Sequence, residues 1–275
     1  MSVTKAFFLT LLLMIAYLLV QLGVIALFEL YDQPITLSNL HLKGLSKTVA
    51  PILSYLVLFK IFWKVKISNK DELRSDFSFK ILTFIIIISI GLELINQPLY
   101  DISKMVEFYK TGIPAIQNFH YSQNSIDLVY QFAAILIVSP ILEELFFRKF
   151  LLSKLLIKYN ISISVIISSL CFSLIHIETP NNLIPSLIFG ILSSIIFLNT
   201  GKIIYSIVFH ALRNSFYFII LLNAEIYDSW IYGFNFNYVY WSLVLIGLVL
   251  VFVGMKKITS ANIGSSQITG IEEKV

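Results

Sequence analysis

The sequence predicts an all-α protein, a polytopic membrane helix bundle with about eight transmembrane helices. Of its 275 residues, 57% are hydrophobic and only 13% are charged, and its mean hydropathy is +0.85. One soluble core cannot bury that much apolar surface. A transmembrane helix needs about 20 mostly apolar residues, and short polar breaks divide the chain into such segments. The predicted spans are 6–28, 48–63, 81–99, 126–147, 161–177, 183–199, 202–222 and 238–255.

The first span begins close to the start of the sequence and is predicted to stay as a membrane anchor. Its apolar run from Ala6 to Phe28 is longer than the apolar core of a secretory signal. A small-residue cleavage site is also missing near the end of that run.

The remaining polar segments define the predicted domain organisation. Residues 64–80 are expected to form a charged inner loop, and residues 100–125 a longer outer loop. Residues 256–275 are expected to form a polar cytoplasmic tail. The sequence shows no internal repeat, so residues 1–255 are predicted to be a single integral membrane domain.

The basic residues predict the orientation of the bundle. If the N-terminus is cytoplasmic, fourteen Lys and Arg residues flank the spans on the inside and four on the outside. Cytoplasmic loops are enriched in these residues, so both termini are predicted to be cytoplasmic. The inner set is Lys5, Lys64, Lys66, Lys70, Arg74, Lys80, Arg148, Lys149, Lys154, Lys158, Lys202, Lys256, Lys257 and Lys274, and the outer set is Lys43, Lys47, Lys104 and Lys110.

Charge and cysteine content argue against a nucleic-acid partner and exclude an intrachain disulfide. The formal net charge of +4 comes from residues that border the spans, and no basic-aromatic RNA-binding pattern is present. Nucleic acid is therefore not an expected partner. Cys171 is the only cysteine, so no intrachain disulfide can form.

The fourth span contains two adjacent carboxylates, although an ionisable group inside a membrane is costly and normally faces protein or a wet cavity. Glu144 and Arg148 are four residues apart and are expected to pair along one helix face. Glu143 is rotated by about 100° from that face and is expected to be free to face another group. Pro140, one turn earlier, lacks a backbone donor and is expected to kink the span.

The fifth and seventh spans each offer one further polar face. On the fifth, Phe172 and His176 are expected to share a face with Ser169 and Ser173. On the sixth, small residues at four-residue spacing favour close helix packing; they are Ser186, Gly190 and Ser194. On the seventh, a polar stripe at helical spacing is formed by Ser206, His210, Arg213, Asn214 and Tyr217.

Counting residues predicts that these faces meet at one depth. Glu143 and His176 are each 16 residues from the turn expected at Tyr159 and Asn160, which corresponds to about 24 Å of helix. His210 is nine residues beyond the turn at Thr200 and Gly201, or about 14 Å. Glu143, His176 and His210 lie at the same depth if the turn between spans four and five projects further towards the cytoplasm than the turn between spans six and seven. The site is then expected in the cytoplasmic-side half of the membrane, within reach of water.

A carboxylate, two imidazoles and an amide in a wet pocket indicate hydrolysis. A carboxylate can take a proton from water, and imidazole and amide groups can stabilise an oxyanion. The same groups also suit a divalent metal such as zinc, held by Glu143, His176 and His210. No H-E-x-x-H helix is present, and no serine or cysteine stands in an obvious nucleophile motif.

The polar residues also resemble the motifs of a known family. The CAAX-protease and bacteriocin-processing family, also called Abi, has three ordered motifs, and this chain is similar to it in each. They are E-E-x-x-x-R, matched by EELFFR at 143–148; F-x-x-x-H, matched by FSLIH at 172–176; and H-x-x-x-N/D, matched by HALRN at 210–214. The resemblance covers roughly residues 126–216. Three ordered motifs are specific where a single one would not be.

The resemblance implies an intramembrane endopeptidase with about eight helices and a cavity open to the cytosol. Its implied catalytic residues are Glu143 and His176, which activate water, and His210 and Asn214, which stabilise the oxyanion. Its implied supporting residues are Glu144, Arg148 and Phe172. The chemistry is glutamate-activated or metal-dependent, and the cofactor is otherwise unknown. Lys149 departs from the family, whose members often have Gly after the motif arginine.

The expected partners are membrane lipid and a peptide or protein substrate. Eukaryotic members of the family cleave after prenylated cysteines, whereas bacterial relatives are linked to pheromone or bacteriocin processing and self-immunity. The composition, rich in Ile, Asn and Lys, suggests an AT-rich bacterial genome and favours a peptide substrate.

Two other classes of function stay open from the sequence. The chain would be a non-catalytic membrane scaffold or bacteriocin-immunity protein if it acted only by binding. It would be a small transporter if Glu143 and Arg213 were coupling charges, although no inverted repeat supports this reading. The full set of motif residues favours the protease, because a pure scaffold has no need to keep these groups in lipid.

Overall fold

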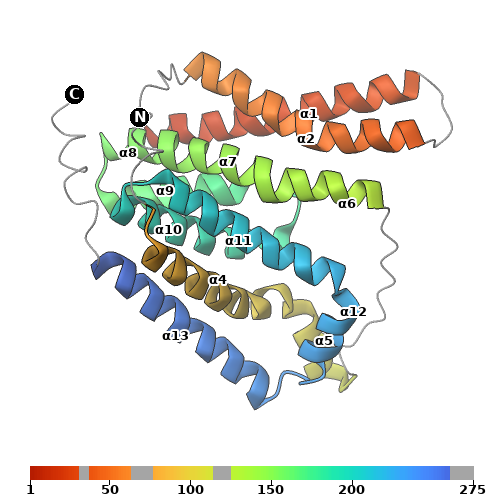
Figure 1. Cartoon of the computed structure of the whole chain (residues 1–275), viewed down its shortest axis with the longest axis vertical. Helices are drawn as coiled ribbons and strands as arrows, with labels where there is room; N and C mark the ends of the chain where they lie inside the picture. Colours follow the sequence, from red (N-terminus) through yellow and green to blue (C-terminus); the bar gives the residue numbers. More distant parts are fainter. Residues whose placement is uncertain (31–36, 63–76, 114–124, 261–275) are drawn as a thin grey trace. The chain divides into compact units, whose positions relative to one another are not determined.

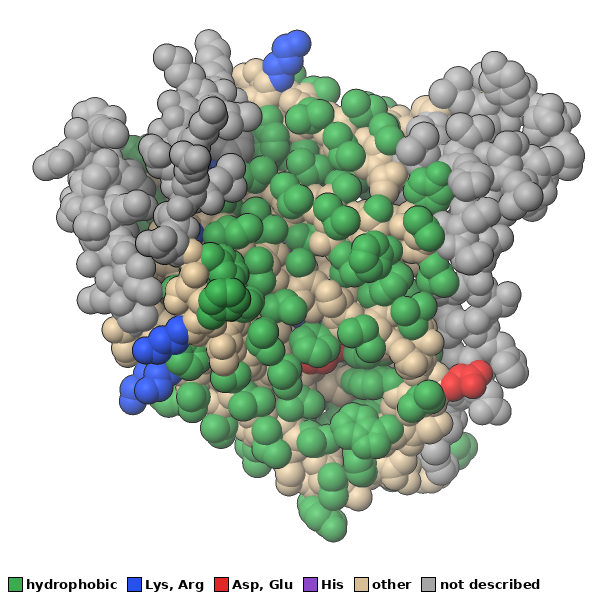
Figure 2. Space-filling view, in the orientation of Figure 1, with side chains coloured by type: hydrophobic (Ala, Val, Ile, Leu, Met, Phe, Trp, Pro, Cys, Tyr) green, Lys and Arg blue, Asp and Glu red, His purple; other side chains and the backbone are tan. Residues whose placement is uncertain are grey.

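The computed structural model of the chain describes residues 1–30, 37–62, 77–113 and 125–260 (Figure 1). Within these ranges every regular element is a helix, which confirms the all-α prediction. Apolar side chains are spread across the described part of the face seen in Figure 2, where few charged side chains are visible, as expected of a surface that faces lipid. The chain is a multi-pass membrane protein.

All eight predicted spans coincide with helices, but their lengths differ. Six helices are long and apolar enough to cross a membrane by length and composition: Val3–Gly23, Phe79–Tyr100, Leu128–Leu156, Pro180–Thr200, Ile203–Leu222 and Tyr238–Ser260. The remaining two predicted spans coincide with the shorter apolar helices Thr48–Phe62 and Ile161–Leu174.

The chain divides into two compact units, each built from two stretches that are distant in sequence. The first consists of Met1–Asp76 and Gln123–Ile175, and the second of Phe77–Ser122 and His176–Val275. The division falls inside the predicted motif region 126–216. The assignment of residues 1–255 to a single domain stays a prediction.

The first unit is built on two long helices and a composite one. Its elements are α1 (Val3–Leu30), α2 (Leu37–Phe62), the composite fourth span and α9 (Ile161–Leu174). α1 packs against both α2 and α9. α2 packs closely against the fourth span at Gly44, where an added Cβ would displace the Tyr130 ring.

The fourth span alternates between α-helix and the wider π-helix. Its successive segments are α6 (Ser125–Phe132), η1 (Ala133–Val138), α7 (Ser139–Glu144), η2 (Leu145–Leu152) and α8 (Ser153–Leu156). Pro140 lies near the start of α7 and cannot donate a backbone hydrogen bond. The predicted irregularity at Pro140 therefore takes the form of π-helical turns before and after the two glutamates, a feature often found at functional sites.

The turn after the fourth span lies where the sequence places it. Asn160 begins α9 as its N-cap, and its side-chain Oδ1 accepts a hydrogen bond of 2.9 Å from the Ile163 N–H. The N–H of Val3 donates to the Tyr159 hydroxyl at 3.4 Å. The start of α1 and the lysine-rich turn therefore lie at the same end of this unit.

The second unit is arranged around α4. Its elements are α4 (Phe79–Tyr100), α5 (Ile102–Thr111), η3 (Pro180–Asn182), α10 (Leu183–Thr200), α11 (Ile203–Leu222), α12 (Ala224–Tyr232) and α13 (Tyr238–Ser260). α4 lies between α11 and α13 (Figure 1) and packs against both. α10 ends at Gly201, whose φ of 67° lies in the left-handed region that glycine adopts without strain.

α4 and α13 cross at two glycines. A Cβ added to Gly247 would lie 2.7 Å from the Gly91 carbonyl oxygen and 2.8 Å from the Leu94 Cβ. A Cβ added to Gly91 would lie 2.7 Å from the Gly247 carbonyl oxygen. Small residues let membrane helices approach closely and gain van der Waals contact, so this crossing depends on the absence of side chains.

One buried carboxylate joins α4, α12 and α13. Asp101 accepts hydrogen bonds from Gln97 Nε2 at 2.8 Å, from the Tyr232 hydroxyl at 2.6 Å and from the Tyr240 hydroxyl at 3.0 Å. Burial and the negative charge of Asp101 raise the pKa of Tyr232, which therefore stays a protonated donor. This carboxylate is fully used as a structural acceptor.

Three boundary predictions are wrong. The predicted outer loop 100–125 contains the helix α5, which follows α4 directly after Asp101. The predicted fifth span ends at Leu174 rather than at residue 177, and α13 continues through Ser260 into the predicted tail. Residues 63–76, 114–124 and 261–275, with most of the predicted inner loop, half of the outer loop and most of the tail, lie outside the described residues.

The glycine crossing gives a first testable prediction. Replacing Gly247 by Ala forces α4 and α13 apart and is expected to lower the stability by about 1–3 kcal/mol, the usual cost of overpacking. The thermal unfolding midpoint of the purified protein in detergent measures this. Gly23→Ala is the matched control, because nothing lies within 4 Å of a Cβ added there. Equal midpoints for the two variants would contradict the assignment.

Candidate active site

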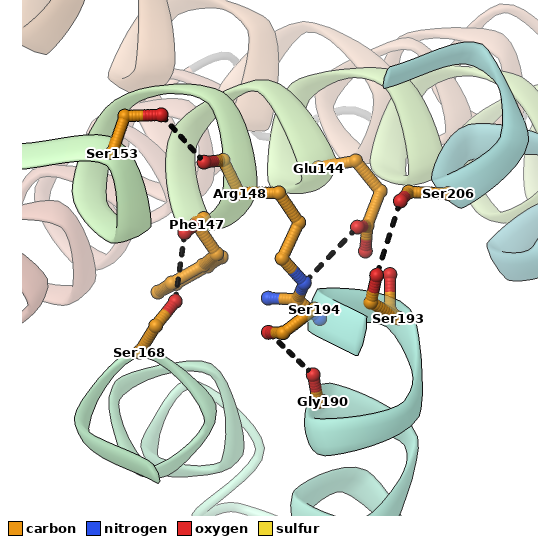
Figure 3. Close-up of polar contacts among 9 residues, drawn as sticks. All are labelled: Glu144, Phe147, Arg148, Ser153, Ser168, Gly190, Ser193, Ser194 and Ser206. Carbon is orange, nitrogen blue, oxygen red and sulfur yellow. Dashed lines mark hydrogen bonds and ion pairs between the residues drawn. The ribbon is translucent and has the colours of Figure 1, made fainter. Parts of the chain in front are cut away.

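The Glu144–Arg148 pair lies at the centre of the first unit. Arg148 Nε is 3.2 Å from Glu144 Oε2, and both side chains are fully buried (Figure 3). The Arg148 guanidinium also lies 4.7 Å from the centre of the Phe172 ring, which suits a cation–π contact. The predicted pair is confirmed, and Phe172 joins it from α9. Breaking such a pair would leave an uncompensated buried charge.

Neighbouring elements hold the η2 segment that carries Arg148. The Ser168 hydroxyl of α9 donates to the Phe147 carbonyl oxygen at 2.7 Å (Figure 3). This bond satisfies a backbone acceptor inside the membrane. On the other side, the rings of Tyr55 and Phe146 meet edge to face with centroids 5.8 Å apart. α2 and α9 therefore hold the segment after the two glutamates in place.

Glu143 is separated from its neighbour in the way that helical geometry predicts, but it has a partner of its own. Its side chain is 9% exposed, and its Oε1 accepts a hydrogen bond from the Ser139 hydroxyl. The expectation that Glu143 is locally unpaired is therefore wrong. Ser139 stands four residues earlier in the sequence, on the same helix face, and this spacing is the signal that was missed.

His176 lies beyond the end of α9. That helix ends at Leu174, and the His176 carbonyl oxygen accepts hydrogen bonds from the Thr179 N–H at 2.9 Å and the Thr179 hydroxyl at 3.1 Å. The expectation that His176 shares the helical face of Phe172 is therefore wrong. Pro180 restricts Thr179, the residue before it, and begins the short 3₁₀ helix η3 (Pro180–Asn182) that follows. His176 belongs instead to a turn between α9 and α10.

His210 is buried on α11 against the sixth span. Its ring lies 4.8 Å from the Phe189 ring, between centroids, with the planes at 56°. One turn earlier, the Ser206 hydroxyl donates to the Ser193 carbonyl oxygen at 3.2 Å (Figure 3). Ser206 and Phe189 thus fix the register of α10 against α11. The residues of the predicted small-residue pattern are all buried: Ser186, Gly190 and Ser194.

The rest of the predicted stripe on α11 divides into different environments. Asn214, one turn after His210, is half-buried, whereas Tyr217 is 51% exposed. Arg213 forms an ion pair with Glu93 of α4, with its Nη1 2.8 Å from Glu93 Oε2. Sequence reasoning missed Glu93. This carboxylate lies inside the third predicted span, where an ionisable group is as costly as Glu143 is in the fourth.

The predicted site residues thus fall into two sets. The first unit holds Glu143, with the buried pair and Phe172; the second holds His176, His210 and Asn214. The approach of Glu143 to the histidines stays a prediction, because the two sets belong to different units. The proposed ligands Glu143, His176 and His210 are donors that zinc accepts. The described residues include no group of three or more His, Cys, Asp or Glu placed to hold a metal.

The comparisons with known proteins match this part of the chain. Residues 125–216 match the family described as type II CAAX prenyl endopeptidase Rce1-like. The chain is also 27% identical over 199 residues to the "Putative membrane peptidase YdiL" of Bacillus subtilis (strain 168), covering 69% of this chain and 77% of that protein. No solved structure matches the chain.

The matched region begins with the fourth span and ends just after Asn214, so it contains all seven residues predicted to form or support the site. The buried Glu144–Arg148–Phe172 group lies within it, as do the turn of His176 and the part of α11 that bears His210 and Asn214. Over residues 125–216 the chain matches the type II CAAX prenyl endopeptidase family, and this match and the Bacillus relative together indicate a membrane protease.

Proposed function

We propose that the chain is an intramembrane endopeptidase in which Glu143 acts as the general base. The observation that carries the proposal is the family match over 125–216, which contains both glutamates and the residues of the other two motifs. The contacts of the two carboxylates agree with separate roles. Glu144 is in a buried ion pair, whereas Glu143 accepts a hydrogen bond from a neutral hydroxyl.

In the proposed reaction, water attacks the carbonyl carbon of the scissile peptide bond. Glu143, together with His176, takes one proton from that water as its oxygen bonds to the carbon. The carbonyl oxygen becomes an oxyanion, which donors on His210 and Asn214 stabilise. The carbon–nitrogen bond then breaks, and the proton held by Glu143 passes to the leaving amine. Atoms and charge balance without a covalent enzyme intermediate.

Glu144, Arg148 and Phe172 support Glu143 in this proposal. Glu144 places a second carboxylate directly next to Glu143. The Arg148 guanidinium, 3.2 Å from Glu144, neutralises that charge within the helix that carries Glu143. Phe172 covers the guanidinium and excludes water from it.

The proposed substrate is a membrane-associated peptide or protein. The described surface is largely apolar, so a lipidated or hydrophobic peptide would reach the enzyme from the bilayer. A role in bacteriocin or pheromone processing, or in self-immunity, is part of this proposal. It takes the composition, rich in Ile, Asn and Lys, as its support.

Removing the proposed base is expected to abolish most of the activity. Glu143→Gln keeps the shape of the side chain but cannot accept the proton, so kcat is expected to fall by about 10²–10⁴-fold. His210→Ala and Asn214→Ala are expected to lower kcat by about 10²–10³-fold through loss of oxyanion donors. Cleavage of a quenched fluorescent peptide with a farnesylated C-terminal C-A-A-X sequence, in detergent, measures this.

Glu107→Gln is the matched control for that assay, because Glu107 is an exposed carboxylate on α5. It is expected to cleave at the wild-type rate. The same peptide without the farnesyl group shows whether the lipid is recognised. Equal rates for the wild type and Glu143→Gln would reject the catalytic assignment, and equal protection of cells against a bacteriocin by both would favour an immunity protein.

A chelator separates the two forms of water activation. If Glu143 acts on water directly, prolonged dialysis against EDTA is expected to leave kcat unchanged, since no metal is needed to generate the nucleophile. A zinc-dependent enzyme would lose cleavage under the same treatment and regain it on addition of Zn²⁺. That result would assign Glu143, His176 and His210 as ligands.

The proposed orientation is tested by single cysteines in intact cells. Lys154→Cys and Lys202→Cys lie at turns that the basic residues place in the cytoplasm, so a membrane-impermeant maleimide is expected to label neither. Lys110→Cys on α5 is expected to react from outside. The native Cys171 is buried and serves as the unlabelled background. Labelling at residue 154 from outside would overturn the topology.

A further inference from the structure

A polar group on α4 makes contacts that the family motifs do not include. Glu93 and Tyr100 lie two turns apart on this helix and both reach Arg213 of α11. Arg213 Nη1 is 2.8 Å from Glu93 Oε2, and Arg213 Nη2 donates a hydrogen bond to the Tyr100 hydroxyl. The side chains of Glu93 and Arg213 are each 13% exposed. The three groups therefore form a largely buried cluster.

The same tyrosine also reaches the turn of His176. The Tyr100 hydroxyl lies 3.3 Å from Asn182 Oδ1 and donates to it. Asn182 in turn donates its N–H to the Thr179 carbonyl oxygen at 2.8 Å, and the Thr179 N–H donates to the His176 carbonyl oxygen at 2.9 Å. A continuous series of hydrogen bonds thus connects α4 to the backbone of His176.

The position of Arg213 makes this cluster relevant to α11 as well. Arg213 follows His210 by three residues and immediately precedes Asn214. A rotation or sliding of α11 that moved either proposed oxyanion donor would also break the 2.8 Å contact with Glu93. α4 therefore restrains both segments that carry second-unit site residues, while it lies outside the matched region 125–216.

We infer that Glu93 and Tyr100 of α4 are positioning residues that hold His176, His210 and Asn214 in their catalytic arrangement. This inference rests on the proposed function. Arg213 contacts both Glu93 and Tyr100, so its charged side chain holds α11 against α4. In this inference Glu93 and Tyr100 affect the rate of cleavage by holding the proposed site residues in place. An ion pair that served stability alone would leave that rate unchanged.

The test separates positioning from folding by the steady-state constants of the farnesylated peptide. Glu93→Gln is expected to lower kcat by about 100-fold, since small displacements of reacting groups have effects of that size. Tyr100→Phe removes one hydroxyl and is expected to lower kcat by about tenfold on the same basis. KM is expected to stay near the wild-type value in every variant. The unfolding midpoint is expected to stay near that of the wild type in Tyr100→Phe and Glu93→Asp and to fall in Glu93→Gln, which leaves the Arg213 charge uncompensated. Glu93→Asp, which keeps the charge, is expected to recover part of the rate.

A second expected signature is non-additivity. Because Glu93 and Arg213 act as a pair, their effects are not expected to add. The double variant Glu93→Gln with Arg213→Gln is expected to be no less active than the less active of the two single variants. The matched control is Tyr227→Phe, which removes a hydroxyl that donates to Gln97 Oε1 of the same helix at 2.6 Å without touching Arg213 or Asn182. It is expected to keep the wild-type kcat.

The outcomes distinguish this inference from the proposed function. If Glu143→Gln abolishes cleavage while Tyr100→Phe and Glu93→Gln keep the wild-type kcat, the positioning role is rejected and the protease assignment stands. If Glu143→Gln leaves cleavage unchanged, the proposed function itself fails. A loss of kcat in Tyr227→Phe equal to that in Tyr100→Phe would also overturn the inference. Should Glu93→Gln fail to fold, Tyr100→Phe and Glu93→Asp retain the test.

Discussion

The arrangement of this protein depends on the pairing of charges inside a membrane. An isolated ion in hydrocarbon is costly, and a charge whose partner is removed destabilises its surroundings strongly. The described spans meet this constraint with two arginines. Arg148 pairs with Glu144 within one helix at 3.2 Å, and Arg213 pairs with Glu93 across two helices at 2.8 Å. The second pair limits how α4 and α11 can rotate against each other, because such a rotation would separate Glu93 from Arg213.

Both pairs lie directly beside residues of the proposed reaction. Glu144 is next to Glu143, and Arg213 is next to Asn214. For Asn214, a neighbouring charge that must stay paired across two helices restrains the orientation of the helix that carries it. π-helical turns flank Ser139–Glu144, the α-helical segment that carries both glutamates and Pro140, and such turns are often found at functional sites. On each of these two helices, a residue of an ion pair stands next to a residue of the proposed reaction.

Sequence reasoning located most of these features and missed others for identifiable reasons. The i,i+4 spacing predicted the Glu144–Arg148 pair, and Asn160 and Gly201 mark the helix ends that the sequence predicted. The ion pair of Glu93 was missed, because its partner is 120 positions away and sequence spacing carries no information about contacts at that distance. His176 was placed on a helix because apolar residues continue past Leu174 to Ile177, whereas α9 ends at Leu174.

The sequence by itself determined that the chain is a helical membrane protein, where its helices lie and which family its motifs match. Local properties suffice for these, since hydropathy, helical spacing and motif order act over short stretches. The tertiary structure determined what each polar group bonds to: Ser139 for Glu143, Phe172 for Arg148, and Glu93 with Tyr100 for Arg213. Except for Ser139, those partners come from other helices, and only the packing of helices brings such residues together.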